Sequence, residues 1–284
     1  MELKLTGIFF TLFTLFWTGQ ISCAADSSTT QPKDTIAVIG TGDMGNSFGP
    51  RLASLGYRIV YGSRNPTSDK VTALVKQTGN GASATTQRDA AQQGDVVLLA
   101  LGWPAMETVT QSMGNLDGKV LIDLSYPPMI VADDGYFQIT VETSSAEMIQ
   151  NWNPGAKVVK AFGTLGSDAI DDPKSIGGPL TVPIASDHRD AKEKVARITA
   201  ELGLDPVDAG PLRIARNIES LQILLMVPLL QKRDAAWDIY FRRSNYWMCN
   251  PYVTADGVYE FPTAPDADNL AEIPYTQGLP EPCP

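Results

Sequence analysis

The chain has 284 residues, of which 43% are hydrophobic and 19% charged, enough for one large domain or two ordinary ones. This composition argues against a wholly disordered chain and against a bundle of membrane spans. Lys and Arg total 22 against 32 Asp and Glu, a net charge of −10, so nucleic acid is not expected as a partner. The one histidine, His188, lies in a polar stretch where we expect a loop or helix start. We therefore predict no metal site and no His-dependent catalytic triad.

The N-terminus is typical of an export signal. Lys4 precedes an apolar run over residues 7–17 that is too short to span a bilayer comfortably, and small residues follow at positions 22–25. We expect a signal peptide over residues 1–25, a polar linker over residues 26–33, and a periplasmic or secreted mature chain with no membrane contact. An uncleaved membrane anchor is the alternative, and a lipoprotein attached through Cys23 is a minor one.

A glycine motif follows the linker. The apolar run over residues 35–39 predicts a strand, which leads into Gly40-Thr41-Gly42-Asp43-Met44-Gly45 at the start of a predicted helix. In such a motif Gly40 permits a tight turn, Gly42 lets a pyrophosphate approach the backbone, and Gly45 lets the helix pack closely on the strand. The phosphates would accept hydrogen bonds from N–H groups at the helix N-terminus.

The end of the second predicted strand, residues 57–61, bears on cofactor choice. NAD sites place Asp or Glu near this point to bind the ribose 2′-hydroxyl, whereas NADP sites place a basic residue there. This chain continues with Gly62-Ser63-Arg64-Asn65-Pro66 and has no acid before Asp69. The Arg64 guanidinium can donate paired hydrogen bonds to a 2′-phosphate, and the Ser63 hydroxyl can donate another. This favours NADP; an ordinary loop arginine is the alternative.

Helices and strands then alternate. We predict helices over residues 69–78, 86–93 and 105–113, and strands over residues 82–84, 95–101 and 119–124. Because parallel strands need crossover connections, the pattern predicts an α/β fold with a Rossmann-like, doubly wound parallel sheet and an NADP-binding domain over residues 34–150. The strand ends, including Leu101-Gly102 and Ser125-Tyr126-Pro127, should converge on one crevice. Gly49-Pro50 lies where the first helix should continue, and we expect a distorted turn there.

Residues 151–243 predict a smaller C-terminal α/β portion. Helices are expected over residues 144–152 and 190–202, and strands over residues 157–162 and 180–184. Residues 213–230 carry Leu and Ile at helical spacing, which is typical of a core or a subunit interface. A homodimer through this helix is a hypothesis.

The last 41 residues form an acidic tail, rich in Pro and aromatic residues. Residues 244–284 hold seven of the 20 prolines, six acids and no Lys or Arg. Proline excludes regular helix over most of the tail, whereas the aromatic side chains are unusual for disorder, so we expect an irregular strap, either near the substrate crevice or away from it. In an exported chain Cys249 and Cys283 could form a disulfide closing a loop of about 35 residues; otherwise both stay unpaired.

From residue 35 to about residue 226 the order of motifs resembles the NADP oxidoreductases that depend on the deazaflavin coenzyme F420, which share an N-terminal domain with pyrroline-5-carboxylate reductases. The resemblance is carried by the glycine motif, by residues 49–53, 61–64, 94–97 and 118–123, and by residues 154–162 and 201–212. It implies that residues 41–45 bind the cofactor phosphates, that Ser63 and Arg64 bind the 2′-phosphate of NADP, and that coenzyme F420 or another flat acceptor stacks on the nicotinamide. Hydride transfer between stacked rings depends on positioning and on the cofactors' own chemistry, so no catalytic residue is assigned.

Two positions depart from the family pattern. Where the family usually shows Asn-Pro and Ala-Phe-Asn-Thr, this chain has Tyr126-Pro127 and Ala161-Phe162-Gly163-Thr164. Each change removes an amide near the expected nicotinamide, and Tyr126 adds a phenol. We predict an NADP(H)-dependent oxidoreductase that transfers a hydride to or from a small, flat acceptor. The alternatives are an imine reductase of the pyrroline-5-carboxylate reductase type and a non-catalytic NADP-binding or interaction protein.

Overall fold

The computed structural model describes residues 33–230 and 237–241, and these belong to one compact unit that begins at Lys33. The predicted signal peptide (residues 1–25), nearly all of the linker, the acidic tail (residues 244–284), Cys249 and Cys283 lie outside the described residues. Export, location and the disulfide therefore stay predictions. None of the helices in the described part is long and apolar enough to cross a membrane.

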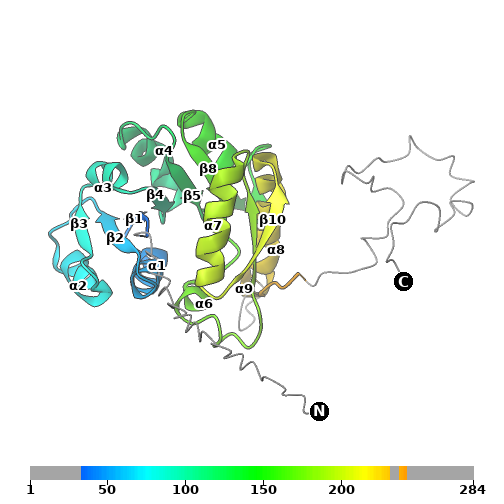
Figure 1. Cartoon of the computed structure of the whole chain (residues 1–284). Helices are drawn as coiled ribbons and strands as arrows, with labels where there is room; N and C mark the ends of the chain where they lie inside the picture. The colour runs from blue at the N-terminus through cyan, green and yellow to red at the C-terminus, as the bar shows by residue number, and fades with distance from the viewer. Residues whose placement is uncertain (1–32, 231–236, 242–284) are drawn as a thin grey trace, which may run out of the picture. The chain divides into compact units, whose positions relative to one another are not determined.

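A single eight-stranded sheet runs through the molecule in the order β10-β9-β8-β5-β4-β1-β2-β3 (Figure 1). The six strands from β8 to β3 are parallel, β8 meets β9 in one antiparallel pair, and β10 is parallel to β9. The predicted Rossmann-like α/β fold is confirmed. The strands are β1 (Thr35–Ile39), β2 (Arg58–Gly62), β3 (Ser83–Thr85), β4 (Val96–Leu99), β5 (Val120–Asp123), β8 (Lys157–Lys160), β9 (Thr181–Ala185) and β10 (Asp205–Gly210).

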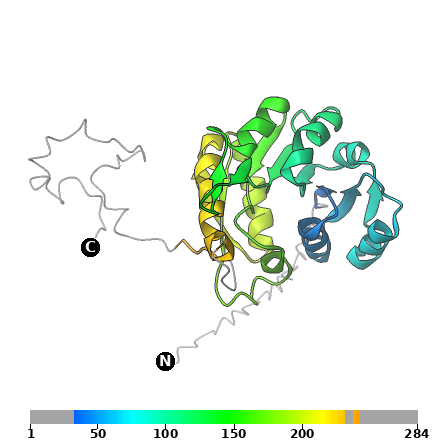
Figure 2. The same ribbon diagram turned by 180° about the vertical axis from the view of Figure 1, so that it is seen from behind.

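Helices cover both faces of the sheet (Figure 2). Alternate residues of β1 divide between two hydrophobic cores: Ile36 and Val38 face one, and Ala37 and Ile39 face the other. The first core is covered by α1 (Asp43–Ser54), α2 (Asp69–Thr78), α6 (Ser167–Asp171) and α7 (Arg189–Glu201). The second is covered by α3 (Gln87–Gln93), α4 (Trp103–Ser112), α5 (Ser145–Trp152) and the start of a C-terminal helical segment, made of η1 (Leu212–Ile214), α8 (Ala215–Leu225) and α9 (Val227–Leu230).

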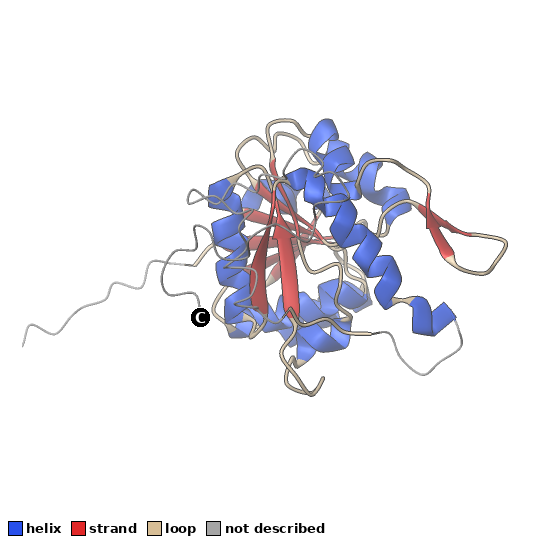
Figure 3. Cartoon of the chain, turned by 90° about the vertical axis from the view of Figure 1, so that its right-hand side faces the viewer, coloured by secondary structure: helices blue, strands red, loops and turns tan. Residues whose placement is uncertain are grey.

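The C-terminal half extends the same sheet. β8 pairs with β5 along its whole length, from Lys157 opposite Val120 to Lys160 opposite Asp123. Strands from residues 34–150 and from residues 151–243 thus share one sheet, and the compact unit has no division at residue 150. The sequence did not predict α6, β10 or the hairpin of β6 (Met129–Val131) and β7 (Phe137–Ile139), which stands out from the body in Figure 3.

Helix α1 continues through Gly49 and Pro50, where we expected a distorted turn. A Cβ atom at position 49 would lie 1.7 Å from the Tyr61 hydroxyl, so glycine lets the helix lie directly on β2. Phe48 and Leu52 are buried on the same side of the helix. Burial of this face outweighs the local cost of a proline within the helix, which is why the prediction was wrong.

The last residues of five parallel strands form one row across the sheet. Gly62, Ile39, Leu99, Asp123 and Lys160 are successive partners on β2, β1, β4, β5 and β8. The loops that leave these strands therefore meet along one edge, which is where open parallel sheets bind ligands.

Candidate functional site

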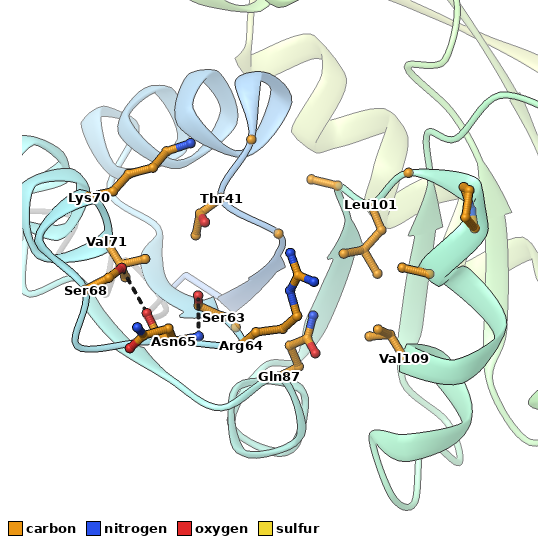
Figure 4. A pocket seen from close by; sticks show the side chains of 17 residues that line it. Thr41, Ser63, Arg64, Asn65, Ser68, Lys70, Val71, Gln87, Leu101 and Val109 are labelled. Carbon is orange, nitrogen blue, oxygen red and sulfur yellow. Dashed lines mark hydrogen bonds between the residues drawn. The ribbon is translucent and has the colours of Figure 1, made fainter.

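A cavity of about 610 Å³ opens at the carboxyl ends of β1, β2 and β4 (Figure 4). This volume is in the usual range for small-molecule sites. Four segments supply the lining: the loop after β1, the loop after β2 with the start of α2, the start of α3, and the loop after β4 with α4. The lining residues are Gly40, Thr41, Gly42, Gly62, Ser63, Arg64, Asn65, Ser68, Lys70, Val71, Gln87, Ala100, Leu101, Gly102, Pro104, Ala105 and Val109.

The three motif glycines differ in their surroundings. Gly40 has a φ of +113°, and a Cβ there would lie 2.1 Å from the Ala100 carbonyl oxygen. A Cβ on Gly45 would lie 2.2 Å from the Gly40 carbonyl oxygen. A Cβ on Gly42 would meet no atom within 4 Å. Gly40 and Gly45 are therefore required by the turn and by helix packing, whereas Gly42 borders open space that a ligand can fill.

The N-terminus of α1 meets the same cavity. Gly42 is the N-cap residue, and no side chain caps the helix. The first N–H groups of a helix have no acceptor within the helix, and the helix dipole adds positive potential. This end of α1 suits an anionic group such as a pyrophosphate.

Two cations, Arg64 and Lys70, line the cavity, and no carboxylate does. Both side chains are exposed, and neither forms a hydrogen bond or ion pair with a residue that the structure describes. Ser63 Oγ accepts a hydrogen bond from the Asn65 backbone N–H at 3.2 Å, which leaves its own hydrogen for a ligand. Ser68 Oγ donates to the Asn65 carbonyl at 3.0 Å and ties the loop to the start of α2 (Figure 4). The donor set suits a phosphate.

The structure brings seven of the ten predicted cofactor-binding residues into the lining: Gly40, Thr41, Gly42, Ser63, Arg64, Leu101 and Gly102. The other three lie outside it. Asp43 is exposed in the first turn of α1, Met44 packs against the core, and Gly45 is buried. Lys70 was not predicted; its signal in the sequence was a second base shortly after Arg64, at the start of a predicted helix.

A buried polar cluster lies beneath the carboxyl ends of β5 and β8. Lys160, which is 0% exposed, donates from Nζ to the Ser125 carbonyl at 2.6 Å, to Ser145 Oγ at 2.9 Å and to Asp123 Oδ2 at 3.1 Å. Its Nζ also lies 3.0 Å from Glu219 Oε1, which accepts from the Ser145 backbone N–H at 2.9 Å. The cluster joins β5, β8, α5 and α8.

One lysine in this cluster faces two carboxylates. Burial raises the pKa of Glu219, against the opposing effects of the Lys160 charge and the Ser145 hydrogen bond. Glu219 Oε2 and both polar atoms of the Gln222 amide are buried without a partner among the described residues. The amide lies against Gly163, where a Cβ would be 1.7 Å from Gln222 Nε2. The Leu and Ile spacing over residues 213–230 gave no sign of Glu219 and Gln222, which are buried on the inward face of α8.

Tyr126 follows this cluster and is 39% exposed. The preceding residue is anchored, because the Ser125 backbone N–H and Oγ both donate to Asp123 Oδ1, at 2.9 and 2.6 Å. Burial raises the pKa of Tyr126, and the charge of Lys160 opposes this. Ser125, Tyr126 and Pro127 do not line the cavity, so the predicted crevice receives the loops after β1, β2 and β4 but not this one.

His188 is the N-cap residue of α7, so the prediction of a helix start is confirmed. It lies near the amino end of β8, because Lys157 at the start of that strand pairs with Asp190 in the first turn of α7. The cavity is at the opposite end of the strands. The described ranges contain no group of three or more His, Cys, Asp or Glu that could hold a metal ion.

Sequence comparisons identify related proteins. The model of a family described as NADP oxidoreductase coenzyme F420-dependent matches residues 35–127. The F420-dependent NADP reductase of Methanothermobacter marburgensis is 31% identical over 205 residues, which are 67% of this chain and 90% of that protein. Metalloreductase STEAP3 of Rattus norvegicus is 28% identical over 200 residues, 69% of this chain, but the match spans 38% of that longer protein.

Solved structures show the same fold. A proposed F420-dependent NADP-reductase of Arthrobacter sp. FB24 has a TM-score of 0.67 at 26% identity, covering 74% of this chain and 100% of that chain. An imine reductase of Myxococcus stipitatus in complex with NADP+ has a TM-score of 0.53 at 20% identity, covering 70% of this chain and 63% of that chain. At 20% identity, the similarity to the imine reductase shows a shared fold and nothing more.

Proposed function

The chain belongs to the family of F420-dependent NADP oxidoreductases, and from this premise we propose that it transfers a hydride between NADP(H) bound in the cavity and a flat second substrate such as coenzyme F420. The observation that carries the proposal is the pair of cations without partners among the described residues, Arg64 and Lys70, in a lining without carboxylates. NAD has a free ribose hydroxyl at the point where NADP has a phosphate, so this donor set suits NADP.

We assign the cofactor's parts to the lining as follows. Gly42 and the N-terminus of α1 hold the pyrophosphate, because a ligand can approach the backbone there. Ser63, Arg64 and Lys70 hold the 2′-phosphate. Leu101 and Gly102 lie towards β5, the side on which the nicotinamide would meet the acceptor. The bound nicotinamide supplies or takes the hydride, and the protein supplies orientation and excludes water.

Arg64→Ala tests the phosphate site. Loss of a charge-assisted hydrogen bond should weaken NADPH binding by about 1.5 to 3 kcal/mol, or roughly 10- to 150-fold in Kd, and leave NADH nearly unchanged. Lys70→Ala should act in the same direction, by less, because an ammonium makes no paired contact. Titration followed by nicotinamide fluorescence measures both constants.

Lys76→Ala is the matched control, because Lys76 lies in the last turn of the same helix as Lys70 but outside the lining. It should bind NADPH like the wild type. Tighter binding of NADH than of NADPH by the wild type would contradict the role given to Arg64.

The acceptor is tested separately. With NADPH bound, the protein is offered coenzyme F420, a flavin or a cyclic imine while the absorbance of the reduced nicotinamide is followed. Turnover with coenzyme F420 supports the proposal. Turnover with the imine alone favours an imine reductase, and stoichiometric NADPH binding with no turnover favours a non-catalytic NADP-binding protein, which the changes at Tyr126 and Gly163 make the second candidate.

A further inference from the structure

A hydride transfer from NADPH must be completed by a proton. The hydride brings two electrons and one hydrogen to a carbon of the acceptor, and the displaced electron pair of the π bond collects on a conjugated nitrogen or oxygen. That atom then takes one proton, so the sum is NADPH plus acceptor plus H⁺ giving NADP⁺ plus reduced acceptor. This inference rests on the proposed function and concerns the source of the proton.

The loops next to the expected acceptor side offer one titratable group. Residues 100–104, 124–127 and 161–164 follow β4, β5 and β8, and Tyr126 is the one titratable side chain among them. The hydroxyl residues nearby are covered: Ser125 is 4% exposed and Thr164 is 8% exposed, whereas Tyr126 is 39% exposed. Tyr126 can therefore both meet a substrate and exchange its proton with water.

The buried cluster holds the backbone that carries Tyr126. Lys160 Nζ donates to the carbonyl of Ser125, the oxygen of the peptide bond that leads into Tyr126, at 2.6 Å. Asp123 accepts from the backbone and the hydroxyl of Ser125 through one oxygen. Pro127, which is buried, fixes φ directly after Tyr126. The hydrogen bonds to Ser125 and the fixed φ of Pro127 restrict the positions that the phenol can take. A group that transfers a proton to a substrate needs such a restricted position.

We propose that Tyr126 is the proton donor of the hydride-transfer reaction and that Lys160, Asp123 and Ser125 are the positioning residues that hold it. As the hydride bonds to carbon, the Tyr126 O–H bond breaks and the proton bonds to the acceptor nitrogen or oxygen. The phenolate left on Tyr126 then takes a proton from water. In the reverse direction the phenolate takes the proton from the reduced acceptor.

The electrostatics of the phenol suit this role. Burial raises the pKa of Tyr126, so the side chain keeps its proton at neutral pH and is available as a donor. Lys160 is the charged group whose field reaches the phenol, and it favours the phenolate formed during transfer. Two carboxylates, Asp123 from β5 and Glu219 from α8, contact Lys160 and reduce that field.

Tyr126→Phe keeps the ring and removes the proton. With coenzyme F420 or a cyclic imine as acceptor, kcat should fall by about 10²- to 10⁴-fold, the usual contribution of a general acid, while the Kd for NADPH stays within about twofold. Tyr240→Phe is the control, because Tyr240 is 51% exposed in a separate segment. It should behave like the wild type.

Failure of the Tyr126 proposal and failure of the proposed function give different results. If the variant keeps more than about a third of the wild-type kcat, Tyr126 is not the donor, although the proposed function stands. If the wild type does not bind NADPH, the proposed function fails. If the wild type binds NADPH but turns over neither acceptor, the pKa of Tyr126 provides the test. This pKa is measured by a pH titration of phenolate absorbance, as the difference between wild type and Tyr126→Phe. Saturating coenzyme F420, added to the NADPH complex, should raise the Tyr126 pKa by covering the phenol, and an unchanged value would overturn the proposal.

Ser125→Ala tests positioning with a small change. It removes the bond from Ser125 Oγ to Asp123 and leaves the backbone contacts in place. We expect kcat to fall by about 3- to 10-fold with NADPH affinity unchanged, as for the loss of one hydrogen bond. In a Tyr126→Phe background the same change should have less than about a twofold effect. An equal effect in both backgrounds would show that Ser125 does not act through Tyr126.

Discussion

At the scale of single residues, the glycines of the loop after β1 separate folding from binding. Gly45 lies against the Gly40 carbonyl, so any side chain there must push α1 away from β1. Gly42 has an extended backbone that any residue adopts, with φ −84° and ψ −163°, and open space around it. These surroundings agree with the different roles expected from the motif: Gly45 is a packing position, and Gly42 faces open space that a ligand can fill.

This difference predicts opposite results for two substitutions of the same kind. Gly42→Ala should change the free energy of unfolding by less than about 0.5 kcal/mol, because the methyl group meets no protein atom. It should weaken NADPH binding at least tenfold if the pyrophosphate lies against the backbone. Gly45→Ala should destabilise the protein by about 1 to 3 kcal/mol, the usual cost of overpacking.

Urea unfolding and NADPH titration of the two variants make the comparison. A Gly42→Ala variant that binds NADPH like the wild type would place the pyrophosphate elsewhere.

At the scale of elements, an ion pair joins α5 to α8. Ser144 and Glu147 form a capping box at the start of α5, and Arg216 on α8 donates to both Glu147 carboxylate oxygens, at 2.8 and 2.7 Å. Burial by itself would raise the pKa of Glu147, but hydrogen bonds from Arg216, Ser144 and Thr143 lower it to about 2. The contact helps to hold α8, which carries Glu219 into the buried cluster.

The lowered pKa of Glu147 predicts a pH dependence. A carboxyl whose pKa is lower in the folded state stabilises the fold above its ordinary pKa, and this contribution is lost as the pH falls through the folded value. Glu147→Gln keeps a capping side chain and removes the charge. It should lower the free energy of unfolding by about 1 kcal/mol at pH 7, a modest amount because solvent screens the half-exposed Arg216. The difference from wild type should shrink as the pH falls from about 4.5 towards about 2.

Urea unfolding at several pH values measures that difference. Glu193→Gln is the control: its partner Arg189 is 91% exposed, and the pair should contribute little at any pH. A Glu147→Gln cost that does not change between neutral and acid pH would contradict the assignment.

The elements themselves were predicted to different degrees. The helix expected over residues 69–78 matches α2, and the strands expected over residues 35–39 and 157–162 match β1 and β8 to within two residues. Their apolar spacing is a local property, so one sequence reveals it. β10 was missed because its sequence, Asp-Pro-Val-Asp-Ala-Gly, has little strand propensity and is a strand only because it pairs with the edge of β9.

At the scale of the whole molecule, one sheet carries both the cofactor cavity and the buried polar cluster along the same edge. Its row of strand ends passes from Gly62, beside the cavity, to Lys160, in the buried cluster. The cofactor cavity and the turn that carries Tyr126 therefore lie along one edge, at opposite sides of β4. The order of the strands in the sheet sets the separation between the cavity and Tyr126, and no local sequence motif predicts that separation.

The homodimer stays a prediction, and the structure supplies variants to test it. The C-terminal helical segment leaves Leu224 and Leu229 exposed, at 54% and 49%. If a second copy covers them, light scattering at micromolar concentration should give about twice the monomer mass, and Leu224→Lys should give the monomer. Ile130→Lys, at an equally exposed position in the β6–β7 hairpin, should leave the mass unchanged. A monomeric wild type would reject the hypothesis.

The sequence by itself determined most of the order of strands and helices along the chain, the glycine loop, and the place of Ser63 and Arg64 directly after the second strand, because each depends on residues that are neighbours in the chain. Only the tertiary structure decided the buried cluster of Asp123, Ser145, Lys160 and Glu219, the place of the Gln222 amide against Gly163, and the inclusion of Lys70 in the cavity. These partners are far apart in sequence or depend on which way a helix faces. The spacing of residues along the chain does not predict the contacts of the buried cluster, because these contacts form only when β5, β8, α5 and α8 pack together.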